Sequence, residues 1–408
     1  MQQTSSAPPS APGTLATVLL LGAISFANAV GTVIVFPLGP FLARDLGARL
    51  EDAALASMSF TMAAGVGGLA GAMLLARANV RIALCASLLG LAVTTVAAGF
   101  APDFPLLLAA RVAGGLCAGP LMGLLVAAVS GAVPETERAR AIGAIVGSYG
   151  LAIVLGLPLA LAFASGWGGW RTAFFATALL CAVLLPPAWV MLGRQTQPAA
   201  AGPPTGLLRL LRQPESLLGL LLIAMASFGT LLISPNLSTY ALQNAGMSAG
   251  ALQIVYALGG GVSLFTTQAA GWVIDRIGPL PASLTVGTVM TLILLGAFGP
   301  VTMPTAALVV LLGLLLAVQL ARSTIAQASA ARVSIPADRV AYQCLASATT
   351  SFFQGAGAGV STLVLAEQAD GTLLGMGWLA GASIALSWLP AAVLTVLERK
   401  LASRAQVL

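Results

Sequence analysis

The sequence contains very little charge. Asp, Glu, Lys and Arg together make up only 7% of the 408 residues, whereas 58% are hydrophobic and the mean hydropathy is +0.98. A soluble domain carries roughly 25% charged residues, so this composition excludes an ordinary globular protein. Apolar runs of about 20 residues, the length that a helix needs to cross a bilayer, recur along the chain. The alternating segments of about ten residues that build membrane β-barrels are missing, so we expect an all-α membrane protein.

Histidine is absent, and no Asp or Glu lies well inside any predicted span. The four cysteines fall singly in apolar segments, at Cys85, Cys117, Cys181 and Cys344. This spacing predicts free thiols rather than a disulfide framework or a metal site. General acid–base catalysis has no residues here from which to build a site, so we expect neither an intramembrane enzyme nor a cofactor.

The apolar runs divide into about twelve predicted spans. In the first half of the chain they lie near residues 15–36, 52–76, 80–100, 104–131, 139–162 and 171–193. In the second half they lie near residues 215–239, 249–273, 282–300, 304–331, 340–365 and 372–397. Residues 37–51 are expected to form the longest loop of the first half.

A linker at residues 194–214 separates the two sets of six spans. It combines a Pro/Gly/Ala-rich run with a basic amphipathic piece, LLRLLR, suited to lie along the inner membrane surface. We therefore expect a disordered tail at 1–14, six-helix bundles at 15–193 and 215–397, and a second tail at 398–408. Repeated helical halves around a midplane binding site are an architecture of transporters.

Lys and Arg are distributed unevenly among the loops. With a cytoplasmic N-terminus, the outer loops hold only Arg44, Arg49 and Arg171, and the remaining basic loop residues lie inside. The positive-inside rule therefore predicts that both termini are cytoplasmic. The net charge of +6 is then an orientation signal and not a nucleic-acid footprint. We expect a monomer in the bacterial inner membrane whose partners are the lipid bilayer and a small-molecule substrate.

The loop after the second span of each half carries a repeated motif. In the second half it reads GWVIDRIG and contains Gly271, Asp275, Arg276 and Gly278. The first-half copy keeps Arg77 and Arg81, but Ala76 replaces the aspartate. The second copy resembles the Gly-x-x-x-Asp-Arg-x-Gly loop signature of the major facilitator superfamily. The resemblance implies that these residues act in gating, by holding the two halves together in one conformation.

Further motifs extend this resemblance over nearly the whole chain. Span four contains an Arg-x-x-x-Gly pattern at Arg111, and span five contains Gly156-Leu157-Pro158 followed by a Gly-Trp-Arg turn. These are similar to the sugar-efflux or arabinose-efflux-like branch of the drug:proton antiporters, although many antiporters have the Gly and Pro adjacent. The resemblance implies the major facilitator fold of twelve helices in two six-helix halves. It also implies secondary transport by alternating access, with Gly156 and Pro158 as gating residues.

Arg111 and Arg322 are the charged side chains that fall well inside predicted spans, away from their ends. A charge at such a position costs about 2.5–3.5 kcal/mol on insertion scales, so function is expected there. Arginine cannot be neutralised by deprotonation and needs an anion, carbonyl oxygens or water. One interpretation is that one or both bind an anionic group of the substrate, and the other is that they pack helices by bonding backbone carbonyls. The missing intramembrane carboxylate argues against a simple proton antiporter of cationic drugs.

Uncharged polar side chains recur in the spans that the resemblance places around a central cavity. The candidates for contact with substrate are Asn28, Tyr149, Asn236, Tyr240, Tyr256, Gln319 and Gln354. Each of them is alternatively an interhelical hydrogen bond worth under about 1 kcal/mol. Glycine clusters in spans two, five, eight and eleven indicate contacts between the halves that open and close, or plain close packing.

We therefore predict a secondary transporter that moves a small organic solute, in one variant an anion, as an exporter. A proton-coupled multidrug or sugar efflux pump is the alternative, so a coupling ion is left open. A ligand sensor that keeps the transporter fold without transporting is a further alternative.

Overall fold

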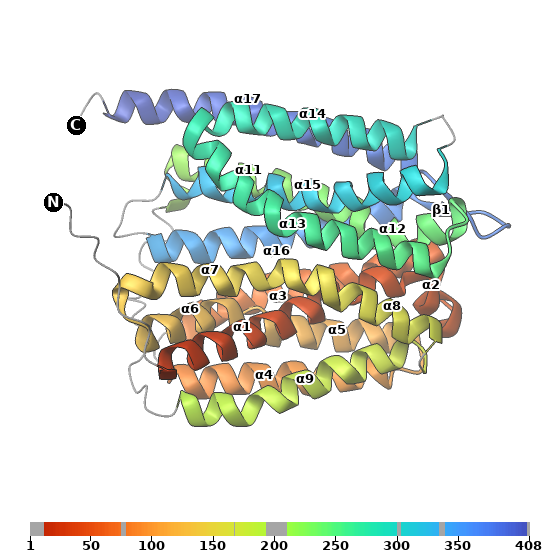
Figure 1. Cartoon of the computed structure of the whole chain (residues 1–408), viewed down its shortest axis with the longest axis horizontal. Coiled ribbons are helices and arrows are strands. Elements are labelled where there is room, and N and C mark those ends of the chain that lie inside the picture. Colours follow the sequence, from red (N-terminus) through yellow and green to blue (C-terminus); the bar gives the residue numbers. More distant parts are fainter. Residues whose placement is uncertain are drawn as a thin grey trace.

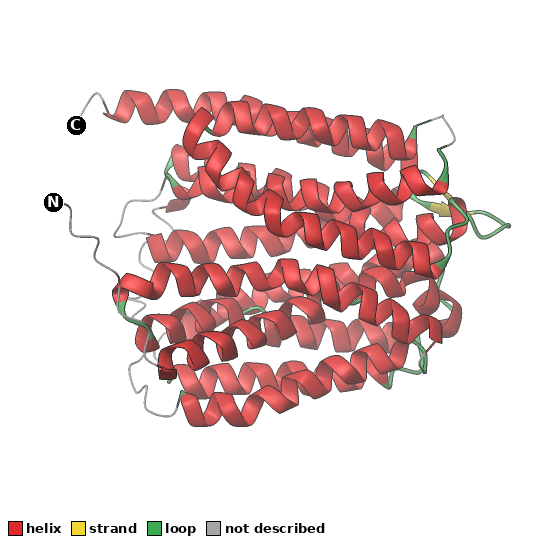
Figure 2. Ribbon diagram, viewed as in Figure 1, coloured by secondary structure: helices red, strands yellow, loops and turns green. Residues whose placement is uncertain are grey.

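The computed structural model of the chain describes residues 12–74, 79–166, 168–192, 210–299, 303–333 and 339–405. Nearly all of this chain is helical, and the helices lie side by side with their axes roughly parallel (Figures 1 and 2). Helix α1 begins and helix α17 ends at the same end of the bundle, which we call the terminal end (Figure 1). The opposite end carries a short β-hairpin and is called the hairpin end.

The first half contains a series of helices, several of which join end to end. They are α1 (Pro12–Val33), α2 (Val35–Leu46), η1 (Leu50–Ala54), α3 (Leu55–Leu74), α4 (Val80–Gly99), α5 (Phe104–Ala118), α6 (Leu121–Ala132), α7 (Glu135–Leu151), η2 (Ala152–Gly156), α8 (Leu157–Gly166) and α9 (Trp170–Met191).

The second half repeats this pattern. It contains α11 (Pro214–Ile233), η3 (Ser234–Asn236), α12 (Leu237–Thr239), η4 (Tyr240–Asn244), α13 (Ala249–Ile277), α14 (Pro279–Phe298), α15 (Thr305–Ala331), α16 (Arg339–Val364), β1 (Ala366–Glu367), β2 (Leu373–Leu374) and α17 (Met376–Ala405). The two strands pair antiparallel, with Ala366 opposite Leu374.

Within the described residues, 11 helical segments are long and apolar enough to cross a membrane. Helix α16 is not among them, although its 26 residues would extend over about 39 Å. Its sequence is rich in Ser, Thr, Gln and Gly, and it lies in the middle of the bundle, between helices of the two halves (Figure 1). The predicted all-α membrane fold is confirmed, and α16 completes the twelve expected helices.

Residues 37–51 differ from the sequence prediction, and α17 extends beyond the end of the last predicted span. Residues 37–51, predicted to be a loop, are mostly helical in α2 and η1. Pro37 lies in the first turn of α2, where a missing N–H breaks no helical bond, and Gly47 ends the helix at a φ of +66°. At the other end of the chain, α17 continues through Ala405, so most of the predicted tail at 398–408 is helical. The residues ERKLASRA contain no Gly or Pro and are mainly good helix formers.

The largest hydrophobic cluster combines buried side chains from both halves, whereas the other four clusters stay within one half. The halves therefore fold around cores of their own and share one further core between them.

Candidate functional site

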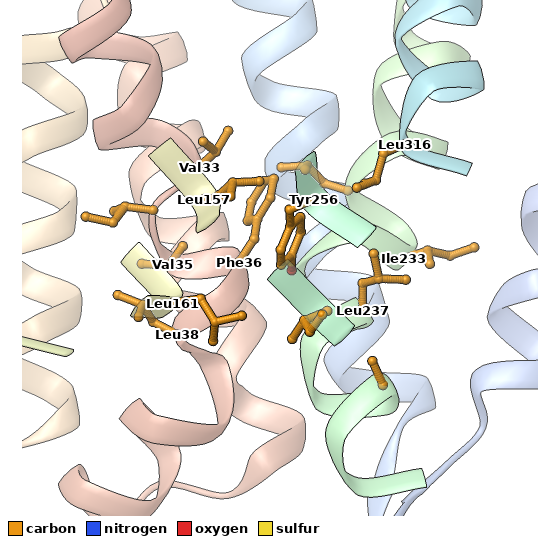
Figure 3. Packing of buried hydrophobic residues seen from close by; sticks show 14 of the residues in the cluster. Val33, Val35, Phe36, Leu38, Leu157, Leu161, Ile233, Leu237, Tyr256 and Leu316 are labelled. Atoms are coloured by element: carbon orange, nitrogen blue, oxygen red, sulfur yellow. The ribbon is translucent and has the colours of Figure 1, made fainter. Parts of the chain in front are cut away.

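Apolar side chains of both halves meet in what we call the plug. It comprises Val33, Val35, Phe36, Leu38, Leu157 and Leu161 from the first half and Ile233, Leu237, Tyr256 and Leu316 from the second. Figure 3 shows the ring of Tyr256 next to that of Phe36, between the helices of the two halves. The Tyr256 side chain is 0% exposed, so the plug excludes solvent at this level.

A proline in the first half creates a hydrogen-bond acceptor for the second half within this region. Pro40 has no N–H, so the carbonyl of Phe36, four residues earlier, lacks its usual helical donor. The hydroxyl of Ser238 donates to this carbonyl at 2.5 Å, and both groups are buried. The backbone irregularity of α2 thus becomes a direct bond between the halves.

Two glutamates form a second connection at the hairpin end, which we call the clasp. The Glu367 N–H donates to Glu51 Oε2 at 2.5 Å, and the Leu50 N–H donates to Glu367 Oε2 at 2.9 Å. Glu51 is only 5% exposed and also forms an ion pair with Arg49. Each glutamate therefore accepts a backbone donor of the opposite half, and such charge-assisted bonds are stronger than neutral ones.

The hairpin that carries Glu367 is fixed to its own half. Asn244 at the end of η4 both donates to the carbonyl and accepts from the N–H of Leu373, at 2.8 and 2.9 Å. In the turn, the hydroxyl and the N–H of Thr372 donate to Asp370, which lowers the pKa of the Asp370 carboxyl. The clasp is thus a rigid contact and not a loose loop.

Closer to the terminal end, the halves approach through glycine. A Cβ on Gly260 of α13 would lie 2.5 Å from the backbone nitrogen of Val154 in η2, and one on Gly150 would lie 2.8 Å from Cδ2 of Leu264. Gly143 and Gly147 lie on the same face of α7 as Gly150, because residues three and four apart share a helix face. Among the described residues, nothing lies within 4 Å of a Cβ placed on either. The face that touches α13 at Gly150 is therefore uncovered toward the terminal end.

The predicted gating residues Gly156 and Pro158 lie at the irregular junction where α7 continues through η2 into α8. Residues 152–156 form a π-helix, and Pro158 leaves the carbonyl of Val154 without its helical donor. A Cβ on Gly156 would lie 2.8 Å from Cγ2 of Val30, so glycine allows α1 to pack closely here.

The loop motif of the second half lies at the terminal end of α13. Gly278 ends the helix at a φ of +85°, and Asp275 and Arg276 are exposed, with the Arg276 guanidinium 4.1 Å from the Trp272 ring. Within the part of the chain that the structure describes, Asp275 has no hydrogen bond or ion pair.

In the first-half copy of this motif, Arg81 lies over the Trp189 ring of its own half at 4.1 Å. Arg77 lies outside the described residues.

Arg111 is held inside the first half. Its Nε, Nη1 and Nη2 donate to the carbonyls of Ala56, Gly31 and Thr32 at 3.1, 2.6 and 3.2 Å. The guanidinium also lies 4.0 Å from the Phe60 ring, which adds a cation–π contact. The side chain is 4% exposed, and every guanidinium nitrogen has a partner. The geometry is that of the carbonyl-bonded packing arginine, one of the two interpretations of the sequence.

Arg322 is buried inside the second half but is bonded incompletely. Its Nη2 donates to the carbonyl of Ala226 at 2.9 Å, whereas Nε and Nη1 have no partner in the described structure. It lines a small cavity together with residues of α11, α14, α15 and α17. Helices α14 and α17 lie on the side of the second half that faces away from the first (Figure 1).

A chain of uncharged polar side chains borders the plug; we call it the polar cluster. The Ser234 hydroxyl donates to Gln319 Oε1 at 2.7 Å, and Asn236 Nδ2 donates to the Ser361 hydroxyl at 2.8 Å. All four residues are at most 3% exposed. Asn236 Oδ1 and Gln319 Nε2 are left without a partner in the described chain. The cluster therefore offers one free acceptor and one free donor and carries no charge.

The remaining candidate residues are dispersed. Tyr240 donates to the carbonyl of Ala297 at 3.1 Å and packs on a neighbouring ring, and Tyr149 packs against the core shared by the halves. Asn28 has a buried Oδ1 without a partner among the described residues, and Gln354 is half-buried on α16. The structure thus brings Asn236, Gln319 and Tyr256 to one region, with Arg322 one helical turn from Gln319 on α15 and Arg111 in the other half.

Three groups that join the halves, Glu51, Glu367 and Ser238, were not among the residues predicted from the sequence, and neither was Ser361 of the polar cluster. Pro40 was the available signal for Ser238, because a proline inside a helix always frees one carbonyl. No comparable signal marks the clasp, whose bonds join residues 316 and 317 positions apart.

Comparison with known proteins agrees with this architecture. The family model described as Major Facilitator Superfamily matches residues 21–362. Over 243 residues the chain is 28% identical to a chloramphenicol resistance protein of Streptomyces lividans, covering 58% of this chain and 61% of that protein. Over 164 residues it is 29% identical to an uncharacterized MFS-type transporter, YwfA, of Bacillus subtilis (strain 168), covering 40% and 39%. The chain thus aligns with less than two thirds of either relative.

Among solved structures, the chain is similar to a bacterial homolog of the human lysosomal transporter Spinster, determined in an inward-facing and unoccupied conformation. The TM-score is 0.72 at 15% identity, and the match covers 96% of this chain and 98% of that one. At this identity the likeness concerns the fold alone.

Proposed function

This chain belongs to the Major Facilitator Superfamily and is a multi-pass membrane transporter, and we propose that it exports a small uncharged organic solute by alternating access. The observation that carries the proposal is the unequal contact between the halves. They are joined by the plug, by the clasp and by close packing of α3 on α16 at Gly355 and Gly359, whereas the face of α7 beyond Gly150 is uncovered toward the terminal end. This is the asymmetry that a transporter has when one end of its central passage is closed.

We assign the terminal end to the cytoplasm of a bacterial cell. The supporting observation is the distribution of Lys and Arg, which are concentrated in the loops at this end. In this orientation the solute enters from the cytoplasm, as export requires.

The polar cluster supports an uncharged solute. A buried polar atom without a partner costs about 1–3 kcal/mol, so a solute that bonds Asn236 Oδ1 and Gln319 Nε2 would recover that cost as binding energy. Ile233 and Leu237 of the plug flank this cluster in sequence and would supply apolar surface. Apart from Glu51 of the clasp, Arg111 and Arg322 are the only buried charged residues of the described chain, and both lie within a half. An organic cation would find no buried acid at the polar cluster.

Opening toward the other side would require the reverse arrangement. The plug would separate, and the clasp and the Ser238 bond would break. The uncovered glycine face of α7 would then close against α13, which is possible because Gly143 and Gly147 have no side chains. Gly260 against η2 lies between these two regions and would act as the pivot.

Transport assays in proteoliposomes test the proposal. Chloramphenicol is the first solute to try, because one relative is a chloramphenicol resistance protein. We expect Gln319→Ala to lower the initial rate about tenfold, as loss of a hydrogen bond to the solute predicts. Gln327→Ala, at an exposed position of the same helix, is the matched control. Unchanged flux in Gln319→Ala, or flux of organic anions only, would refute an uncharged solute bound at the polar cluster.

A proton-coupled efflux pump is the second candidate, and Glu51 favours it. Protonation of this buried carboxylate would weaken its ion pair with Arg49 and its bond to the Glu367 N–H, which links a proton to opening of the hairpin end. Flux that responds to an imposed pH gradient, and loses that response in Glu51→Gln, would support coupling. Flux that ignores the gradient would exclude it.

A further inference from the structure

A small cavity lies beside Arg322 in the second half. Its volume is about 10 Å³, and it is lined by Leu222, Ala226, Ser283, Val286, Arg322, Ile325, Ala326, Pro390 and Leu394. The lining is apolar except for the Arg322 guanidinium and the Ser283 hydroxyl. The lining comes from α11, α14, α15 and α17, and none of these residues belongs to the plug or the polar cluster.

A glycine of α11 leaves the space that the Arg322 guanidinium occupies. A Cβ on Gly229 would lie 2.6 Å from Nη2 and 3.0 Å from Nη1 of Arg322, so the absence of a side chain gives the guanidinium its space. Arg322 is 5% exposed, and only Nη2 is bonded, to the carbonyl of Ala226. Nε and Nη1 are both buried and without a partner among the described residues.

The positive charge of Arg322 also has no counter-charge among the described residues. No acidic side chain of the described chain forms an ion pair with it. Arg111 provides the internal comparison, because its three nitrogens all donate to carbonyls. A water molecule in the cavity would satisfy a free donor of Arg322 but would leave its charge uncompensated in a low-dielectric interior.

We propose that this cavity binds one small inorganic anion of about the size of chloride. Nε and Nη1 of Arg322 are its donors, and the Ser283 hydroxyl is within the same lining to add a third. The volume fits a group about as large as one water molecule, which excludes organic anions. The site is therefore a resident anion site that stabilises the second half, independent of the solute that the protein carries.

Thermal unfolding of the purified full chain in detergent tests the site. We expect the midpoint in sodium chloride to exceed that in sodium gluconate of equal ionic strength by about 2–5 °C, with a saturable dependence on chloride. Arg322→Gln should lose this dependence. Arg111→Gln, the matched control, should lower the midpoint in both salts equally and keep the dependence on chloride.

Two further experiments test the site even if Arg322→Gln fails to fold. One is a variant with a smaller change, and the other locates the anion directly. Ser283→Ala should raise the chloride concentration for half the effect by up to about tenfold. Crystals grown in bromide should show an anomalous peak within hydrogen-bonding distance of Arg322. Equal wild-type midpoints in chloride and gluconate, or a cavity without a bromide peak, would show that water fills the site and would overturn the proposal.

Discussion

The two halves place one arginine each in corresponding helices, α5 and α15, and accommodate it differently. In the first half, α1 ends at Val33 before α2 begins, so the carbonyls of Gly31 and Thr32 are available where Arg111 reaches them. In the second half, α11 runs unbroken to Ile233, and Arg322 meets it one to two turns earlier, at Ala226 and Gly229. Carbonyls inside a regular helix already accept helical N–H groups, so Arg322 finds only one. A helix break therefore decides whether a buried arginine is satisfied by the protein alone.

The largest expected effect separates the two arginines. Arg111→Ala removes three charge-assisted bonds and leaves three buried carbonyls, so we expect a loss of about 2–4 kcal/mol in unfolding free energy. Arg322→Ala in gluconate should cost less than about 1 kcal/mol, because it removes one bond together with an uncompensated charge. Denaturation of both variants by a graded detergent series measures the difference. Equal losses would show that the halves do not differ in this way.

A second prediction concerns the contact between the halves. Gly260→Val forces a side chain against Val154. We expect this overpacking to lower the free energy of unfolding by about 1–3 kcal/mol and to abolish most transport. Gly261→Val, where nothing lies within 4 Å of the added Cβ, is the neighbouring control and should transport at nearly the wild-type rate. Equal activity of the two variants would exclude a pivot at Gly260.

The clasp should stabilise the contact between the halves less than the plug does. We nevertheless expect it to set the population of molecules that are open at the hairpin end. Glu51→Gln weakens the Arg49 ion pair and the bond to the Glu367 N–H, so we expect about a tenfold rise in the population open at the hairpin end, equivalent to about 1.4 kcal/mol. The rate at which a thiol reagent labels Leu237→Cys, a buried plug position, measures this population. Asp52→Asn, beside Glu51 but partly exposed, should leave the rate unchanged.

The smallest expected effect compares two glycines of corresponding helices, α1 and α11. Gly22→Ala has open space and should stabilise the protein by about 0.5–1 kcal/mol through helix propensity. Gly229→Ala should lose this gain, because its Cβ displaces the Arg322 guanidinium, and it should also weaken the chloride dependence of the thermal midpoint. A stabilised Gly229→Ala that keeps the full chloride dependence would contradict the assigned position of the guanidinium.

Much of the fold could be predicted because a membrane span is determined by residues that are neighbours in the sequence. Each span needs only a sufficient length of apolar sequence, and the loop motif at Gly271–Gly278 lies within eight residues of one helix end. The prediction of a loop at residues 37–51 was wrong, and Pro37 and Pro40 both lie within a helix there. In the structure the first lies in a helical turn that tolerates it, and the second frees a carbonyl that Ser238 occupies.

The candidate site was less predictable from the sequence. Asn236 and Gln319 are near one another because Ser234 links α11 to α15, a relation between positions 85 residues apart. The sequence left both interpretations of the buried arginines open, since the identity of an arginine does not reveal which carbonyls surround it.

By itself, the sequence determined that this chain lies in a membrane as two halves of six helices, because hydrophobic length and the repeated motifs are properties of neighbouring residues. Only the tertiary structure decided which end is closed, which polar atoms remain free and which arginine lacks a counter-charge. These depend on hydrogen bonds and side-chain packing between segments hundreds of residues apart, where a shift of a single helical turn changes every partner.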